Sequence, residues 1–299
     1  MDARTGEPIA GANAPPLPYD AAPHGLRLPP GMNFGGVSGV AFNSRDHLFV
    51  FHRGPGPLME FDPDGVFVRA LGEGHFVRPH GLRIDADDNI WVTDVAAHFA
   101  VKFSPEGRIL MVLGIKGTAG EWNQFGNLRL LNEPSEVAVA PNGDLYVLQG
   151  HGKAPSCVLR FDRDGNFLSA WGQTGAAPGE FDIPHSIVFD DDGRLHIADR
   201  SNGRFQVFEA DGTFVRERAY RGTPCGLWRA PDGHIWLAHG HTGKVMKLSP
   251  QGDVLGVMAG LGKTLGKFGE AHYIAVNSRG EVFVADSLNW QVQKFVERR

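Results

Sequence analysis

The sequence predicts an all-β protein, a six-bladed β-propeller, and three observations carry this prediction. One unit of roughly 40 to 55 residues recurs six times, a period typical of propellers and solenoids. Each copy contains short apolar runs with the alternation expected of strands, separated by turns rich in Asp, Asn and Gly. The 299 residues include 40 glycines and 20 prolines, and no long helical pattern accompanies them.

The first predicted strand of each copy opens with a polar residue or a cysteine followed by apolar positions. In order, the openings are Ser38-Gly39-Val40, His80-Gly81-Leu82, Ser135-Glu136-Val137, His185-Ser186-Ile187, Cys225-Gly226-Leu227 and His272-Tyr273-Ile274. Tight turns follow, such as Asp85-Ala86-Asp87-Asp88 and Pro141-Asn142-Gly143, before a second strand such as Asn89-Ile90-Trp91-Val92. Asp, Asn and Gly suit these turns because they supply side-chain hydrogen bonds or positive φ.

The last copy lacks its outer strand, since the chain has no second turn after Lys294-Phe295-Val296. A closed ring would leave an exposed edge there unless another segment pairs with it. We expect a strand between Leu17 and Leu28 to close the last blade. The predicted division is a flexible N-terminal tail over residues 1–16 and a single propeller domain over residues 17–299.

Composition excludes several function classes. The formal net charge of −5 argues against a nucleic-acid surface, which needs clustered Lys and Arg. No stretch reaches transmembrane length and the N-terminus lacks an apolar signal-peptide core. Two cysteines, Cys157 and Cys225, offer no disulfide framework. We therefore expect a cytoplasmic protein without nucleic-acid or membrane partners; the oligomeric state is not predicted.

Histidine leads the first strand in every second copy, at His80, His185 and His272. The entry residue of an innermost propeller strand faces the central channel, and alternate blades lie about 120° apart in a six-fold ring. Three neutral imidazoles can therefore converge on the axis, the ligand set of catalytic zinc with one open position. The alternative is a ring of polar residues that only solvates the channel.

Two arginines share one register. Position 15 after the leading residue, at the end of the second strand, is Arg53 in the first copy and Arg200 in the fourth. That strand end returns to the channel mouth, where an arginine beside an open metal position could clamp a carboxylate. The alternative is two ordinary surface arginines.

The motifs resemble NHL repeats and, more specifically, the peptidyl-α-hydroxyglycine α-amidating lyases, from about Val37 to Phe295. The matching segments are Phe51-His52-Arg53-Gly54, Pro79-His80-Gly81-Leu82, Trp91-Val92-Thr93-Asp94-Val95-Ala96, Pro184-His185-Ser186 and Ala198-Asp199-Arg200-Ser201-Asn202-Gly203-Arg204. The resemblance implies zinc on His80, His185 and His272. It also implies that Arg53 and Arg200 engage a substrate carboxylate, in a reaction that cleaves an N-acyl-α-hydroxyglycine to an amide and glyoxylate.

Three positions depart from that family. His151 stands where the family has its catalytic tyrosine; it could serve as the base or be a surface-loop histidine. Glu270 replaces a methionine and could orient a ligand, act as base or be a solvated charge. Tyr273 replaces an acidic calcium-binding residue, so calcium is not predicted. Glu270 and Tyr273 are candidate substrate-binding residues, and the departures suggest retained metal chemistry with a small carboxylate-bearing substrate.

The predicted function is thus a metal-dependent carbon–nitrogen lyase of the amidating-lyase type acting on a carbinolamide. One alternative is a metal-dependent hydrolase of a small amide or ester that uses zinc-bound hydroxide. The other is a non-enzymatic NHL module that binds a protein or peptide.

Overall fold

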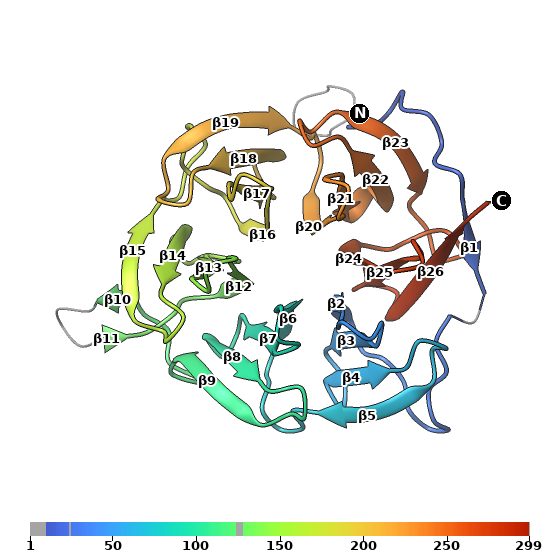
Figure 1. The fold of residues 1–299 in the computed structure, drawn as a ribbon, viewed down its shortest axis with the longest axis horizontal. Coiled ribbons are helices and arrows are strands. Elements are labelled where there is room, and N and C mark those ends of the chain that lie inside the picture. Colours follow the sequence, from blue (N-terminus) through green and yellow to red (C-terminus); the bar gives the residue numbers. More distant parts are fainter. Residues whose placement is uncertain (1–9, 24, 124–127, 299) are drawn as a thin grey trace.

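A computed structural model of the chain describes residues 10–23, 25–123 and 128–298. Six four-stranded antiparallel sheets surround a central axis, each running from an inner to an outer strand (Figure 1). The one helical segment among the described residues is a single 3-10 turn, η1 (Gly240–Thr242). The predicted all-β, six-bladed propeller is confirmed.

Each blade has the same strand order, with the inner strand first. Blades 1 to 3 are β2 (Val37–Phe42), β3 (Leu48–His52), β4 (Leu58–Phe61), β5 (Phe67–Leu71); β6 (Pro79–Ile84), β7 (Ile90–Asp94), β8 (Phe99–Phe103), β9 (Ile109–Gly114); and β12 (Pro134–Val139), β13 (Leu145–Gln149), β14 (Cys157–Phe161), β15 (Phe167–Trp171). Blades 4 and 5 are β16 (Pro184–Phe189), β17 (Leu195–Asp199), β18 (Arg204–Phe208), β19 (Phe214–Ala219); and β20 (Pro224–Arg229), β21 (Ile235–His239), β22 (Lys244–Leu248), β23 (Val254–Ala259). A short hairpin, β10 (Trp122–Asn123) and β11 (Leu128–Arg129), precedes blade 3.

Blade 6 is built from both ends of the chain. It consists of β24 (Ala271–Val276), β25 (Val282–Asp286), β26 (Gln291–Glu297) and, at its outer edge, β1 (Tyr19–Ala22). β1 runs antiparallel to β26 in a register that pairs Tyr19 with Glu297 (Figure 1). The predicted closing strand is therefore confirmed, and it pairs an edge that the last repeat would otherwise leave open.

The turns between strands form for the reason their composition indicates. In blade 1, the Asp62 carboxylate accepts hydrogen bonds from the backbone N–H groups of Asp64 and Val66. Gly65 closes the same turn at φ +77°, a conformation that other residues rarely adopt.

Apolar packing lies between the blades. Phe49 and Phe51 of blade 1 are buried against Leu82 and Ile90 of blade 2, and a comparable cluster lies at each of the other five blade junctions. Burial of one such side chain contributes about 1.5–3 kcal/mol. The blades are thus held rigidly, and their inner strands can fix side chains at the axis.

The predicted tail over residues 1–16 falls partly on residues 1–9, which lie outside the described part of the chain. Of the rest, Ala10 donates its N–H to the Arg221 carbonyl and Pro16 forms a parallel bridge with Val257. The division into a flexible tail and a domain stays a prediction. Within the described ranges, none of the helical structure has the length and apolar character needed to cross a membrane.

Candidate metal centre

His80, His185 and His272 meet at the channel axis, as their spacing predicts. The ring centroids are 4.7 Å apart for His80 and His185, 4.9 Å for His80 and His272, and 4.8 Å for His185 and His272. All three side chains are buried. The near-equal separations reflect their equivalent positions on β6, β16 and β24.

A bulge places each of these histidines. The pairing between the first two strands of a blade shifts register at the leading residue, between Pro79 and Leu82, between Pro184 and Ser186, and between Ala271 and Ile274. The same shift occurs in the other three blades. Because a bulge re-aims the side chain at the extra residue, it explains how the leading side chain turns from the sheet toward the channel.

Each histidine is oriented by the backbone of the next blade. The Nδ1–H groups of His80, His185 and His272 donate to the carbonyl oxygens of Ser135 (2.8 Å), Cys225 (3.3 Å) and Ser38 (2.8 Å). These acceptors place the proton on Nδ1 and leave a lone pair on Nε2. Since Nε2 lies on the opposite side of each ring, the three lone pairs face the centre.

The environment keeps these imidazoles neutral. Burial lowers the pKa of His272 to about 4 and those of His80 and His185 well below the ordinary value of 6.5. Neighbouring histidines and arginines lower the pKa values of His80 and His185 further. At neutral pH the cluster is therefore a set of neutral nitrogen donors, the form that binds a metal.

His151 completes the cluster from a different direction. It follows β13 in a loop, and its ring centroid lies 4.2 Å from that of His80 and 5.3 Å from that of His185. One ring nitrogen from each of the four histidines lies within 4.8 Å of the other three. The sequence singles out His151 as a base or a loop histidine; the structure brings its ring to the histidine cluster itself.

The unpaired nitrogens fit a cation. The Nε2 atoms of His80 and His185 are buried and make no hydrogen bond among the described residues, a loss of about 1–3 kcal/mol for each buried acceptor. One water molecule carries two hydrogens and cannot satisfy three lone pairs that face one point. A single cation shared by the three nitrogens would satisfy them all, and imidazole nitrogens suit Zn²⁺.

Both predicted arginines lie beside the cluster. Arg53 Nε–H donates to the carbonyl of Pro79, the residue before His80, at 3.2 Å. Arg200 Nε–H donates to Cys225 Sγ at 3.3 Å, and its Nη2 forms an ion pair with Glu270 at 2.8 Å. Arg53 therefore contacts the residue before His80, and Arg200 contacts Glu270, which lies two residues before His272. Neither arginine is an ordinary surface side chain.

Glu270 is buried and paired. Its second carboxylate oxygen accepts the Ser287 hydroxyl, and its side chain is only 10 % exposed. Burial raises its pKa, but His272, Ser287 and Arg200 outweigh that effect and lower the pKa to about 2. Glu270 is thus a fixed negative charge, and the interpretation of it as a solvated loop charge is wrong.

Tyr273 lies deeper in the channel. Its side chain is fully buried and its hydroxyl donates to the His185 carbonyl at 3.1 Å. Beside it, Arg83 pairs with the buried Glu136 at 2.6 Å and donates to the carbonyls of Ile187 (3.2 Å) and Leu227 (2.9 Å). These contacts join blades 2 to 6 across the axis. Substrate contact by Tyr273 stays a prediction.

A set of supporting residues was missed at the level of sequence. Position 14 after each leading histidine is an aspartate, and each accepts N–H groups from the segment just before that histidine: Asp94 from Val77 and Arg78, Asp199 from Asp182, and Asp286 from Gly269 and Glu270. The recurrence of Asp in the three histidine-bearing blades was the signal that could have revealed them.

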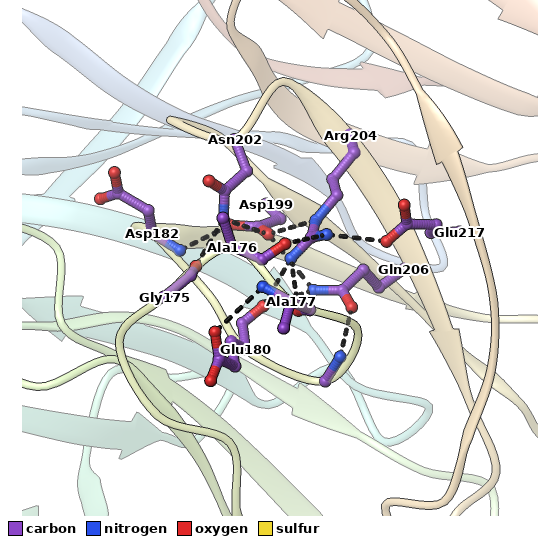
Figure 2. Close-up of polar contacts among 11 residues, drawn as sticks. Gly175, Ala176, Ala177, Glu180, Asp182, Asp199, Asn202, Arg204, Gln206 and Glu217 are labelled. Carbon is purple, nitrogen blue, oxygen red and sulfur yellow. Dashed lines mark hydrogen bonds and ion pairs between the residues drawn. The ribbon is translucent and has the colours of Figure 1, made fainter.

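The most extensive of these supports is in blade 4. Asp199 also accepts hydrogen bonds from Asn202, Arg204 and Gln206, and Arg204 extends to the Ala176, Ala177 and Glu180 carbonyls and to Glu217 (Figure 2). The network fixes the turn between β17 and β18 that carries Arg200. Arg204 is 7 % exposed and Asp199 is fully buried, so the centre of the network is shielded from water, whereas Glu217 at its edge is 43 % exposed.

Comparison with known proteins agrees with this architecture. The NHL repeat model matches residues 181–208. The chain is 32 % identical over 313 residues to peptidyl-glycine alpha-amidating monooxygenase B of Xenopus laevis, covering 89 % of this chain and 34 % of that protein. It is 29 % identical over 296 residues to peptidyl-alpha-hydroxyglycine alpha-amidating lyase 1 of Drosophila melanogaster, covering 87 % of this chain and 52 % of that protein.

The chain thus spans about a third of the length of the Xenopus relative and about half of the fly one. Among solved structures, a streptogramin B lyase superposes with a TM-score of 0.66 at 14 % identity, covering 94 % of this chain and 98 % of that one; this shows the fold alone. The chain is therefore a six-bladed β-propeller that carries an NHL repeat and is similar in sequence to the peptidyl-α-hydroxyglycine α-amidating lyases.

Proposed function

We propose that the chain is a zinc-dependent carbon–nitrogen lyase that cleaves an N-acyl-α-hydroxyglycine-like carbinolamide to an amide and glyoxylate. One observation carries the proposal. Three neutral imidazoles from alternate blades aim Nε2 lone pairs at one point beside two arginines. The similarity to proteins named as amidating lyases supports the reaction type.

His80, His185 and His272 would hold the zinc. When bound, zinc supplies Lewis-acid polarisation, which lowers the pKa of a hydroxyl group beside it. Residues of the chain bind and orient the substrate and transfer its proton. Arg53 and Arg200 bind the substrate carboxylate through paired N–H donors and so orient the carbinol carbon over the cluster.

The reaction needs one group to accept the carbinol proton. His151 is the better candidate, because its buried Nε2 makes no hydrogen bond to the described residues and the ring lies with the histidine cluster. Burial lowers the pKa of His151, so the ring is unprotonated at neutral pH. Glu270 is a weaker candidate because both of its carboxylate oxygens are already engaged, one by Arg200 and the other by the Ser287 hydroxyl. As His151 Nε2 takes the carbinol proton, the oxygen electrons form the carbonyl of glyoxylate and the C–N bond breaks. His151 then gives that proton to the departing amide nitrogen, which restores the neutral ring.

The partner is then a small carboxylate-bearing molecule, and neither nucleic acid nor a membrane is part of the proposal. The buried contact between Arg200 and Glu270 leaves little positive charge unopposed at the site, which suits one carboxylate. A cytoplasmic location also remains a proposal; it is supported by Cys157 and Cys225 being free thiols.

The proposal is tested by metal analysis of the purified protein and by glyoxylate release from α-hydroxyhippurate. We expect one zinc per chain and glyoxylate formation that His80→Ala abolishes, while His75→Ala, which changes an exposed histidine in the loop between β5 and β6, preserves both. A protein that binds no metal would reject the mechanism. Products formed in heavy-oxygen water distinguish a hydrolase, which must incorporate solvent oxygen.

A further inference from the structure

We propose that His151 is a fourth nitrogen ligand, so that the resting metal centre is a four-histidine site with no open position. This inference rests on the proposed metal site and deepens it. The geometry supports it first, because His151 offers a ring nitrogen within 4.8 Å of those of His80, His185 and His272. His151 lies closer to His80, by ring centroid, than the three predicted ligands lie to one another.

The hydrogen bonding of His151 supports it as well. Its Nε2 is buried and makes no hydrogen bond among the described residues, a state that it shares with the Nε2 atoms of His80 and His185. A buried nitrogen without a partner costs free energy. The three rings that carry these nitrogens pack against one another, which indicates a common partner. Four imidazoles match the coordination number that Zn²⁺ prefers in closed sites.

The backbone under His151 is fixed, although its ring is not anchored as the others are. Glu133 holds the loop: its carbonyl accepts the N–H groups of Gly150 and His151, and its carboxylate accepts those of Gly152 and Ala154. By contrast, no hydrogen bond to the described residues orients the His151 ring, whereas Nδ1 of each of the other three rings is bonded to a carbonyl. The loop therefore delivers the ring to the metal and still permits a side-chain rotation.

This arrangement has a chemical consequence. A site closed by four histidines cannot bind a substrate hydroxyl until one ligand leaves, and His151 is the ligand that no neighbour holds in place. Once released, the same nitrogen lies beside the substrate and is free to accept its proton. His151 would thus occupy the fourth coordination position in the resting protein and accept the substrate proton after the substrate displaces it.

The test uses the whole chain with its histidines labelled with ¹⁵N and loaded with ¹¹³Cd, a spin-active substitute for zinc. We expect four histidine Nε2 resonances with ¹¹³Cd coupling in the wild type, and three in His151→Gln, where the missing signal identifies His151. His75→Gln, which changes an exposed histidine in the loop between β5 and β6, is the matched control and should keep all four. Zinc affinity, measured by competition with a chromophoric chelator, should fall at least about tenfold in His151→Gln and stay unchanged in His75→Gln.

A cavity variant guards against a folding defect. In His151→Gly, added imidazole should restore the lost zinc affinity, since a free ligand can occupy the vacated space. Three coupled resonances in the wild type, or equal zinc affinity of wild type and His151→Gln, would overturn the inference while leaving a three-histidine lyase intact. Four coupled resonances without glyoxylate release would instead uphold this inference and reject the proposed function. A wild type that binds neither metal rejects both.

Discussion

Arg200 and Glu270 form an ion pair across the mouth of the histidine cluster, with Nη2 and Oε1 2.8 Å apart and both side chains at most 16 % exposed. They come from blades 4 and 6, and Glu270 lies two residues before a predicted metal ligand. The pair places a carboxylate of the protein on the guanidinium that is expected to bind the carboxylate of the substrate.

Glu270 should therefore weaken the binding of anionic substrates. Glu270→Gln keeps an amide oxygen for Arg200 but removes the charge, so we expect the KM for α-hydroxyhippurate to fall by roughly three- to tenfold. The KM for its uncharged methyl ester should not change. Glu209→Gln, in a half-exposed pair with Arg194 on the outer side of blade 4, is the control. An unchanged KM for the acid would show that Glu270 does not oppose the substrate charge.

Arg53 should act on the carboxylate alone. Arg53→Ala removes one charged hydrogen-bond donor, and we expect the KM for the acid to rise by about 10- to 100-fold. Zinc content should remain at the wild-type level, because Arg53 contacts the Pro79 backbone and not a histidine ring. Steady-state kinetics on the acid and the ester, with the exposed Arg45→Ala as control, measure the effect; equal losses on both substrates would contradict carboxylate binding.

Stability should fall with acidification, in part through His52. Its Nδ1 accepts the N–H groups of Gly35 and Gly54, and its Nε2–H donates to the Gly56 carbonyl, a pattern that requires the neutral ring. Burial lowers its pKa to about 4, so between pH 6.5 and 4 the unfolded chain binds more protons than the folded chain. Stability then rises with pH across this window and is lost as pH falls through it.

Between pH 7.5 and 5 the contribution of His52 is about 2 kcal/mol. Urea unfolding of the metal-free protein at both pH values measures it. Glutamine can accept and donate hydrogen bonds in the same way without titrating. The free energy of unfolding of His52→Gln should therefore fall by about 2 kcal/mol less than that of the wild type between pH 7.5 and 5. Equal losses in the two proteins would mean that His52 does not titrate as its surroundings indicate.

The hydrogen-bond network around Asp199 should contribute several kcal/mol to the free energy of unfolding. Asp199→Ala removes the buried carboxylate partner of Arg204 and leaves only the half-exposed Glu217, so we expect a loss of up to about 3–5 kcal/mol. Asp192→Ala breaks an exposed pair with Arg194 and should cost less than about 1 kcal/mol. Urea unfolding compares the two variants, and similar small losses would show that the network in Figure 2 contributes little to stability.

The fold and the three axial histidines could be predicted from sequence because both follow from repetition. A repeat fixes equivalent positions, and the ring brings equivalent positions to one axis. The alternation of histidine at His80, His185 and His272 therefore translated directly into proximity. The aspartates at Asp94, Asp199 and Asp286 obey the same repetition and could have been found in the same way.

The rest of the site depends on features that do not repeat. His151 reaches the cluster on a loop whose course is set by the Glu133 carboxylate, and no periodic pattern encodes that course. Glu270 looked like a loop charge, because the sequence does not reveal that its side chain turns inward to Arg200 and Ser287. The direction of Tyr273 depends on the local bulge at His272 and Tyr273, which alters the simple alternation of a strand.

The contacts of Arg83 with Glu136, Ile187 and Leu227 determine how a small molecule can reach the central channel. The guanidinium of Arg83 lies across the central channel and obstructs it on the side away from the histidine cluster. In the proposed reaction, the reactant would enter and both products would leave through the mouth beside the histidine cluster, so the product nearer that mouth would have to leave first.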